Sequence, residues 1–159
     1  MDKDSREARL KAMRLLTARD YTEQALRDKL KQGGFSPEDT EDAISYVKSY
    51  GYVDDLRYAR NYARSSSGVR SALETRRKLM NKGVAGDLID QAISEEYDGD
   101  EAEDELIRRL IRKKVRDPEN MDLKGRQKVL SYMYGKGFKP DRVNRILEEV
   151  LLDITSQTV

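Results

Sequence analysis

Cysteine and histidine are both absent from this 159-residue sequence, and their absence excludes several kinds of chemistry. Without cysteine there is no disulfide, no thiolate nucleophile and no cysteine-ligated zinc site. Without histidine the side chain that most often performs acid–base catalysis near neutral pH is missing. The sequence also contains no Walker loop, no G-x-S-x-G elbow and no paired-acid metal spacing. We therefore expect a protein that is not an enzyme and that uses no metal or cofactor.

Proline, which interrupts helices, is scarce, and tryptophan is absent. The chain has three prolines and ten glycines. Charged residues make up 38 % of it and hydrophobic residues 37 %. This composition suits exposed amphipathic helices better than sheets, and it favours an all-α fold. A length of 159 residues accommodates one ordinary domain or several small units that share a core.

Long hydrophobic runs are missing as well. No stretch approaches the roughly 18 apolar residues that a membrane span needs. The opening segment MDKDSREARLKAMRLL also lacks the uninterrupted apolar region of a secretion signal. We expect a cytoplasmic protein without a membrane partner.

An internal repeat of about 50 residues becomes visible when Gly34, Gly83 and Gly137 are aligned. Apolar residues recur at three offsets from the glycine, namely four before it (Leu30, Leu79, Met133), one after it (Phe35, Val84, Phe138) and ten after it (Ile44, Ile93, Leu147). The copies differ at the position eight residues before the glycine. The middle copy has Thr75 there, whereas the other two copies have an aliphatic residue. The recurrence at helical spacing indicates three related helical segments.

Each of these glycines is placed to end a helix. A helix C-terminus commonly needs a residue with positive φ, which glycine adopts without a Cβ clash. The next helix is expected two or three residues later, with Ser36 as its N-cap and Pro37 at its first position. Pro140 stands at the equivalent place in the third copy.

The helix that each glycine ends should begin after a capping residue. Twelve positions before the glycines stand Thr22, Ser71 and Gly125, which we predict to be these N-caps. Further helical runs precede these helices at residues 6–18, 55–66 and 101–116. Three helices in each of three units give about nine helices. We place the three units at residues 1–53, 54–98 and 99–159, and call them repeats 1, 2 and 3.

Charge is distributed unevenly although the formal net charge is only +1. Residues 56–86 carry eight basic side chains and one acid, residues 87–105 carry ten acids and no base, and residues 108–116 carry six bases and no acid. Asymmetry of this kind concerns partners and association rates rather than the fold.

Seven residues of the first basic segment are candidate binding residues. They are Arg57, Arg60, Arg64, Arg70, Arg77, Lys78 and Lys82. The first three recur at spacings of three and four, so they form a stripe on the helix predicted over residues 55–66. Clustered basic residues are typical of a surface that contacts acidic protein or phosphate. The alternative is a solvated face, or one neutralised by the acids of residues 87–105.

The segment GYVDDLRYARNYA places two aspartates directly before this helix. Asp54 is predicted to be its N-cap, and Asp55 to interact favourably with the helix dipole. A metal or acid–base pair would need further ligands, which the neighbouring sequence does not supply. Tyr58 and Tyr62 are four apart and share a helix face. We expect them to pack between repeats 1 and 2, with stacking on nucleic-acid bases as the alternative.

Three segments, LLTARDYTEQALRDKLKQGGF, GYVDDLRYARNYA and LETRRKLMNKGV, together resemble the bacterial RecX family of recombination regulators in order and spacing. The segment KVLSYMYGKGF is similar to the family's looser C-terminal pattern, so the resemblance extends from Arg6 to Leu151. The chain departs from the pattern at Thr75, where the family usually has an aliphatic residue, and at Lys78, where it often has glutamate. The glycine-containing turn before that helix is also shifted, to SSSGV.

The resemblance implies tandem three-helix repeats in an elongated and curved arrangement. It also implies a monomeric regulator of homologous recombination and the SOS response that binds RecA filaments on single-stranded DNA, in their helical groove. The protein would inhibit RecA's ATP hydrolysis, strand exchange and co-protease activity. The seven basic residues are then the expected contact surface for RecA or DNA, and a direct contact with DNA stays open.

Two other functions stay open from the residues themselves. One is sequence-independent binding of nucleic acid without RecA, in which the basic stripe and residues 108–116 contact phosphates. The other is a scaffold that binds a different protein, because a repeat architecture does not dictate the partner.

Overall fold

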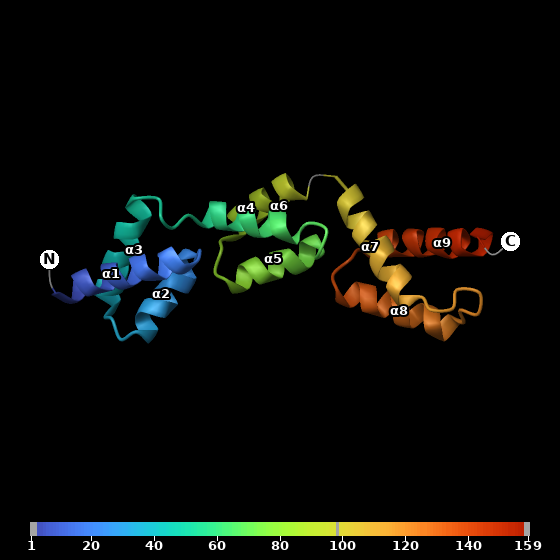
Figure 1. The fold of residues 1–159 in the computed structure, drawn as a ribbon, viewed down its shortest axis with the longest axis horizontal. Helices are drawn as coiled ribbons and strands as arrows, with labels where there is room; N and C mark the ends of the chain where they lie inside the picture. Colours follow the sequence, from blue (N-terminus) through green and yellow to red (C-terminus); the bar gives the residue numbers. More distant parts are fainter. Residues whose placement is uncertain (1–2, 98, 158–159) are drawn as a thin grey trace. The chain divides into compact units, whose positions relative to one another are not determined.

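The computed structural model describes residues 3–97 and 99–157, and within these ranges the chain forms nine α-helices and no strand (Figure 1). The helices are α1 (Lys3–Ala18), α2 (Glu23–Gln32), α3 (Pro37–Ser49), α4 (Asp55–Ser66), α5 (Ala72–Asn81), α6 (Gly86–Glu96), α7 (Glu101–Lys114), α8 (Leu123–Gly135) and α9 (Pro140–Gln157). The prediction of an all-α fold with three helices in each repeat is confirmed. None of the helices in the described part of the chain is long and apolar enough to cross a membrane.

The predicted capping residues set most helix starts. The hydroxyl oxygens of Thr22, Ser36 and Ser71 each accept a hydrogen bond, at 3.1 Å, from the backbone N–H three residues further on. Each bond satisfies one of the N–H groups that the first turn of a helix leaves without a partner. Pro37 and Pro140 occupy the first positions of α3 and α9, as predicted.

The predicted cap of α8 was wrong by three residues. Its N-cap is Asp122, whose carboxylate accepts a hydrogen bond from the Gly125 N–H at 2.7 Å. The spacing of twelve residues between cap and glycine does not hold in repeat 3, because α8 has 13 residues, whereas α2 and α5 each have ten. An aspartate upstream therefore provides the capping oxygen that glycine lacks.

The three aligned glycines end their helices as predicted. Gly34, Gly83 and Gly137 have φ angles of 87°, 86° and 92°, in the left-handed region that favours glycine. The apolar residue that follows the glycine in repeat 3, Phe138, is buried. The repeat found in the sequence is thus a repeat of one turn geometry as well as of apolar positions.

Contacts between Cα atoms group the chain into two compact units that divide repeat 2 between them. Unit 1 contains the described residues up to Tyr62 together with Arg77–Ala92. Unit 2 contains Ala63–Arg76 and the described residues from Ile93 onward. The predicted repeat boundaries, after residues 53 and 98, stay a prediction.

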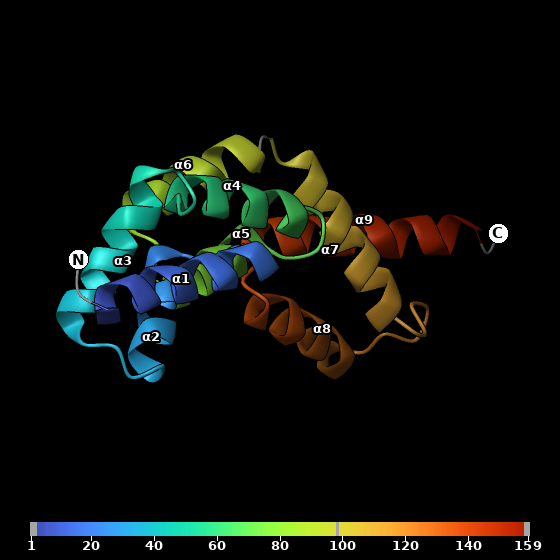
Figure 2. The same cartoon turned by 60° about the vertical axis from the view of Figure 1, so that its left-hand side comes forward.

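In unit 1, helices α1, α2 and α3 pack against one another (Figure 2). The buried residues of α1 are the alanines Ala8 and Ala12, which lie four apart on one face. Leu26 and Leu30 of α2 cover the same core with no exposed surface. Apolar side chains at helical spacing thereby form a core from three short helices that would be marginal alone.

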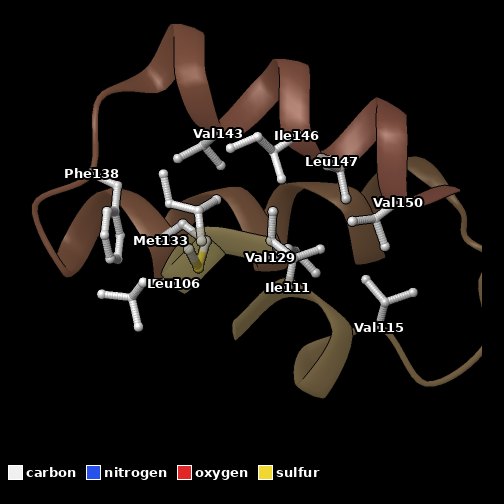
Figure 3. Close-up of a cluster of buried hydrophobic side chains, with 11 residues drawn as sticks. Leu106, Ile111, Val115, Val129, Met133, Phe138, Val143, Ile146, Leu147 and Val150 are labelled. Carbon is white, nitrogen blue, oxygen red and sulfur yellow. The ribbon is translucent and has the colours of Figure 1, made fainter. Parts of the chain in front are cut away.

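In unit 2, helices α7, α8 and α9 enclose a second core, whose side chains converge between the three helices (Figure 3). Its buried members include Leu106, Ile111, Met133, Phe138, Val143 and Leu147. An ion-pair network joins α9 to α7 beside this core. The Arg142 guanidinium lies 2.7 Å from the Asp104 carboxylate and 3.3 Å from that of Glu103.

One type of contact joins successive repeats inside each unit. In unit 1 the Thr22 hydroxyl donates a hydrogen bond to the Lys82 carbonyl at 2.5 Å. In unit 2 the Ser71 hydroxyl donates to the Lys136 carbonyl at 2.6 Å. Each hydroxyl caps the second helix of one repeat, and each carbonyl directly precedes the positive-φ glycine of the next repeat. We call this contact the repeat joint.

The glycines at the repeat joints are needed for space as well as for φ. A Cβ on Gly83 would lie 2.4 Å from the Cβ of Gln24, and a Cβ on Gly137 would lie 2.8 Å from the Ser71 hydroxyl oxygen. At Gly34 of repeat 1, by contrast, a Cβ would meet nothing within 4 Å. The close approach of the preceding repeat therefore restricts Gly83 and Gly137 but not Gly34.

The departure from the repeat pattern at Thr75 has a structural reason. Thr75 is fully buried, and its hydroxyl lies 2.7 Å from the hydroxyl of Tyr97. The Tyr97 hydroxyl donates to the Arg70 carbonyl at 3.1 Å, so it accepts the proton of Thr75. Burial raises the pKa of the Tyr97 phenol. An aliphatic residue at position 75 would leave the phenolic oxygen of Tyr97 without this donor.

Candidate functional site

The two aspartates before α4 use their carboxylates on two different helices. Asp54 accepts a hydrogen bond from the Arg57 N–H at 3.0 Å, which confirms it as the N-cap of α4. Asp55 reaches α2 instead, where it accepts a hydrogen bond from the N–H of Glu23, the first residue of that helix, at 2.8 Å. Burial raises the pKa of the Asp55 carboxyl, while the bond from the Glu23 backbone lowers it. Asp55 therefore connects repeat 2 to repeat 1, a role that the dipole prediction missed.

In the described part of the chain, no group of three or more acidic side chains is arranged to hold a metal ion. The carboxylates of Asp54 and Asp55 are both occupied with backbone N–H groups. Their chemistry is that of helix capping.

Three of the seven candidate basic residues lie on α4, and each has a different environment. Arg57 is exposed and lines a shallow pocket with Tyr52. Arg60 is half-buried and has an intramolecular partner. Arg64 is exposed, but its guanidinium donates two hydrogen bonds to the Glu96 carboxylate at 3.0 and 3.3 Å. The acidic segment thus neutralises Arg64, whereas Arg57 makes no ion pair with another described residue.

The other four candidates lie on or beside α5. Arg77 is exposed, and Lys78 is half-buried. Arg70 is half-buried too, and its guanidinium lies 3.4 Å from a serine hydroxyl four residues earlier. The Lys82 ammonium lies 5.8 Å from the centre of the Tyr62 ring. Arg77 is therefore the most accessible cation of this group.

The seven candidates do not all belong to one compact unit. Unit 1 contains Arg57, Arg60, Arg77, Lys78 and Lys82, and unit 2 contains Arg64 and Arg70. A single contact surface made of all seven stays a prediction.

The tyrosines of α4 stack on each other. The ring centres of Tyr58 and Tyr62 lie 6.4 Å apart with an angle of 11° between the planes. Both residues are half-buried, so the predicted packing in the core is only partial. One face of Tyr62 also receives the ammonium of Lys82, a cation–π contact that neutralises no charge.

A second group of tyrosines was missed by sequence reasoning. The ring of Tyr50 lies 5.2 Å from that of Tyr46 and 5.7 Å from that of Tyr52, and it stacks on the latter. Tyr50 and Tyr52 are 62 % and 46 % exposed. The signal was available in part, because Tyr50, the C-cap of α3, follows Tyr46 of that helix by four residues. The turn at Gly51, with φ of 73°, brings Tyr52 back beside them.

The second basic run, residues 108–116, is partly neutralised within unit 2. Arg108 pairs with Glu105 and, at 3.2 Å, with Glu149. Arg112 lies 3.9 Å from the Asp153 carboxylate. The four further cations of the run are exposed. Arg109 donates a hydrogen bond to the Gly68 carbonyl at 2.7 Å, and the others are Lys113, Lys114 and Arg116.

Each repeat matches a family model. The models described as the first, second and third three-helix domains of RecX match residues 8–46, 54–93 and 101–147, respectively. The matches follow the order of the repeats along the chain and together cover most of it.

Known relatives and solved structures agree with these matches. The chain is 33 % identical over 145 residues to the regulatory protein RecX of Trichlorobacter lovleyi, covering 88 % of this chain and 93 % of the relative. It is 33 % identical over 144 residues to that of Legionella pneumophila, covering 87 % and 91 %. The crystal structure of RecX from Lactobacillus salivarius superimposes with a TM-score of 0.84 at 19 % identity, over 96 % of this chain and 99 % of that one. A second regulatory protein RecX gives 0.82 at 24 % identity, over 91 % and 72 %. At these identities the structures show a shared fold.

Proposed function

The chain belongs to the RecX family of regulatory proteins, and on that premise we propose that it regulates homologous recombination and the SOS response by binding RecA filaments on single-stranded DNA. Bound in the helical groove of the filament, it inhibits RecA's ATPase, strand exchange and co-protease activity. The observation that carries the proposal is the match of all three repeats, in order, to the three RecX domains.

The contact with the filament is assigned to the basic residues of repeat 2. Arg57 and Arg77 support this assignment most directly, because both are exposed and form no ion pair with another described residue. Both lie in unit 1. Exposed cations of this kind steer association with a negatively charged partner and help to fix its orientation.

The proposal is tested by the single-strand-dependent ATPase of RecA from the same organism, titrated with this protein at physiological salt. Inhibition well below one protein per RecA monomer is expected, because a regulator that acts on the growth or disassembly of filaments needs few copies. An unchanged ATPase at equimolar protein would contradict the proposal.

The contact surface is tested by reversing two charges. The variant R57E/R77E should require at least about tenfold more protein for the same inhibition, since two steering charges become repulsive. The matched control is K11E/R14E, which changes the charge equally at two exposed positions of α1 in the same unit. Equal inhibition of the RecA ATPase by both variants would show that Arg57 and Arg77 are not part of the contact surface.

A second candidate function is sequence-independent binding of nucleic acid without RecA. The observation that favours it is the exposure of Lys113 and Lys114 at the end of α7 and of Arg116 just beyond it. Binding to DNA that weakens steeply with salt, together with an unaffected RecA ATPase, would make it the main function.

A further inference from the structure

Repeat 3 contains a cleft with a largely cationic rim. The cleft has a volume of about 760 Å³ and lies between the C-terminal end of α7, the following loop and α8. Four of its lining residues are basic: Lys113, Lys114, Arg116 and Lys128. All four are exposed, and they come from three different segments of unit 2. We call this feature the repeat 3 cleft.

Helix electrostatics accounts for only part of this cluster. Lys113 and Lys114 lie in the last turn of α7, where cations are favoured by the helix dipole. Arg116 lies beyond the helix, and Lys128 comes from α8, so neither has that explanation. Lys114 contacts Tyr132, with its ammonium 4.1 Å from the ring centre. Lys113, Arg116 and Lys128 form no ion pair with another residue that the structure describes.

The acidic residues of the cleft are occupied with the backbone and the loop. Both oxygens of Asp117 accept hydrogen bonds from Asn120, at 3.4 Å from its backbone N–H and at 2.9 Å from its side chain. Asp122 caps α8 through the Gly125 N–H. Four cations against these two acids leave a surplus of two positive charges around one concavity. Like charges held together in this way favour an anionic ligand.

The remaining lining residues indicate which anion fits. The cleft also contains the apolar side chains of Leu110, Met121 and Val129, which can contact sugars or bases between phosphates. Three of the four cations are lysines, which bind phosphate as point charges, and the planar fork of Arg116 matches the geometry of phosphate oxygens. The cleft is concave and within the range of about 300–1,000 Å³ that encloses small ligands, so it admits a flexible strand more readily than a duplex.

We propose that the repeat 3 cleft binds the sugar–phosphate backbone of single-stranded nucleic acid, without sequence preference and without RecA. Lys113, Arg116 and Lys128 neutralise successive phosphates, and the apolar floor contacts the strand between them. This inference rests on the second candidate function and gives it a site. The site is separate from the basic residues of repeat 2, so it does not depend on whether RecA is the protein's partner.

The test measures binding of a fluorescein-labelled 20-nucleotide oligothymidylate to the full chain by anisotropy, in a series of NaCl concentrations and without RecA. The variant K113A/R116A/K128A should bind at least about tenfold more weakly at low salt. Its plot of log affinity against log salt should be shallower by about 2, because each lost contact with a single strand removes about 0.7 from the slope. Lys114 is left in place because of its contact with Tyr132.

The matched control is K11A/R14A/K139A, which removes two lysines and one arginine from exposed positions outside the cleft. It should keep the wild-type slope. A cleft variant with the affinity and slope of the wild type would overturn the proposal. Stronger binding of a duplex, or displacement of the oligonucleotide by polyglutamate at equal charge concentration, would also overturn it, the latter in favour of an acidic protein segment.

Two further measurements keep the result interpretable. Circular dichroism melting checks that the triple variant folds, and the single variant K128E replaces it if it does not, with a slope shallower by about 0.7 expected. The RecA ATPase assay is run in parallel with both triple variants. If only the cleft variant loses oligonucleotide binding, the cleft is supported as the binding site, even if the wild type does not inhibit RecA. If the wild type inhibits RecA and the cleft variant binds the oligonucleotide as the wild type does, the cleft proposal is overturned and the proposed function stands.

Discussion

At the scale of single residues, glycine shows how one residue type can have two roles in the same repeat. Gly34 and Gly83 have nearly the same φ, 87° and 86°, and both end the second helix of their repeat. They differ in their surroundings, because only Gly83 faces the Gln24 side chain of the preceding repeat. The first role follows from backbone sterics, and the second from tertiary packing.

This difference predicts unequal effects of the same substitution. G34A should lower the free energy of unfolding by about 1–3 kcal/mol, because alanine is strained at positive φ. G83A should lower it by a further 1–3 kcal/mol or so, because its Cβ would overlap Gln24 at the repeat joint. Urea denaturation of both variants and the wild type measures the two losses. Equal losses would show that the Gln24 side chain at the repeat joint moves away from the added Cβ with no further loss of unfolding free energy.

At the scale of helices, N-caps show the same division between local and tertiary roles. Thr22 and Ser36 both cap their helices at 3.1 Å. Thr22 is 1 % exposed and also donates to the Lys82 carbonyl, whereas Ser36 is exposed. The same capping chemistry thus stabilises one helix in the case of Ser36, and one helix and a repeat joint in the case of Thr22.

The prediction at this scale compares the two caps. S36A should cost about 1 kcal/mol of unfolding free energy, the usual value for a lost N-cap. T22V preserves the shape of threonine but removes the cap and leaves the Lys82 carbonyl without its hydroxyl donor, so a loss of about 2–4 kcal/mol is expected. Thermal and urea unfolding of both variants check the ratio. A T22V loss no larger than that of S36A would mean that the joint hydrogen bond contributes nothing.

At the scale of the whole molecule, the chain consists of two compact units, each with its own polar contacts between elements. Thr22 and its joint belong to unit 1, and the Arg142 network belongs to unit 2. Arg142 has 15 % of its side chain exposed and lies within 3.5 Å of three carboxylates. No hydrogen bond or ion pair described above is shared between these two sites.

The absence of a shared partner predicts that their effects add. R142A should cost about 2–3 kcal/mol, because it leaves the carboxylates of Glu103 and Asp104 without their main cation. The double variant T22V/R142A should lose the sum of the two single losses to within about 0.5 kcal/mol. Denaturant unfolding of the four proteins measures this directly. A deviation above about 1 kcal/mol would show that the units are energetically coupled.

Charge also has to be considered for the whole molecule. The net charge of +1 conceals basic and acidic blocks, and their sequence alone suggested neutralisation as well as binding. Neutralisation is seen for Arg64, which pairs with Glu96, while Arg57 and Arg77 are exposed and their role in binding stays a prediction. The three-dimensional positions of the acids decide which cations are neutralised. The sequence could therefore name seven candidate binding residues together, but it could not show which of them are free of ion pairs.

What the sequence by itself determined is what depends on neighbours a few residues away. It determined the all-α class, the helix starts capped by Thr22, Ser36 and Ser71, and the glycine turns. These features follow from backbone sterics and capping chemistry. The cap at Asp122 was missed because helix length varied between repeats, although the chemistry is the same.

Only the tertiary structure decided which distant groups meet. The bond from Thr22 to Lys82 spans 60 residues, and that from Ser71 to Lys136 spans 65. The second role of Asp55 and the hydroxyl pair of Thr75 and Tyr97 likewise depend on segments brought together by burial of apolar faces. The reason is physical: a hydrogen bond between distant segments has no periodicity that a sequence pattern could reveal, and it forms only after the hydrophobic cores have fixed the helices in place.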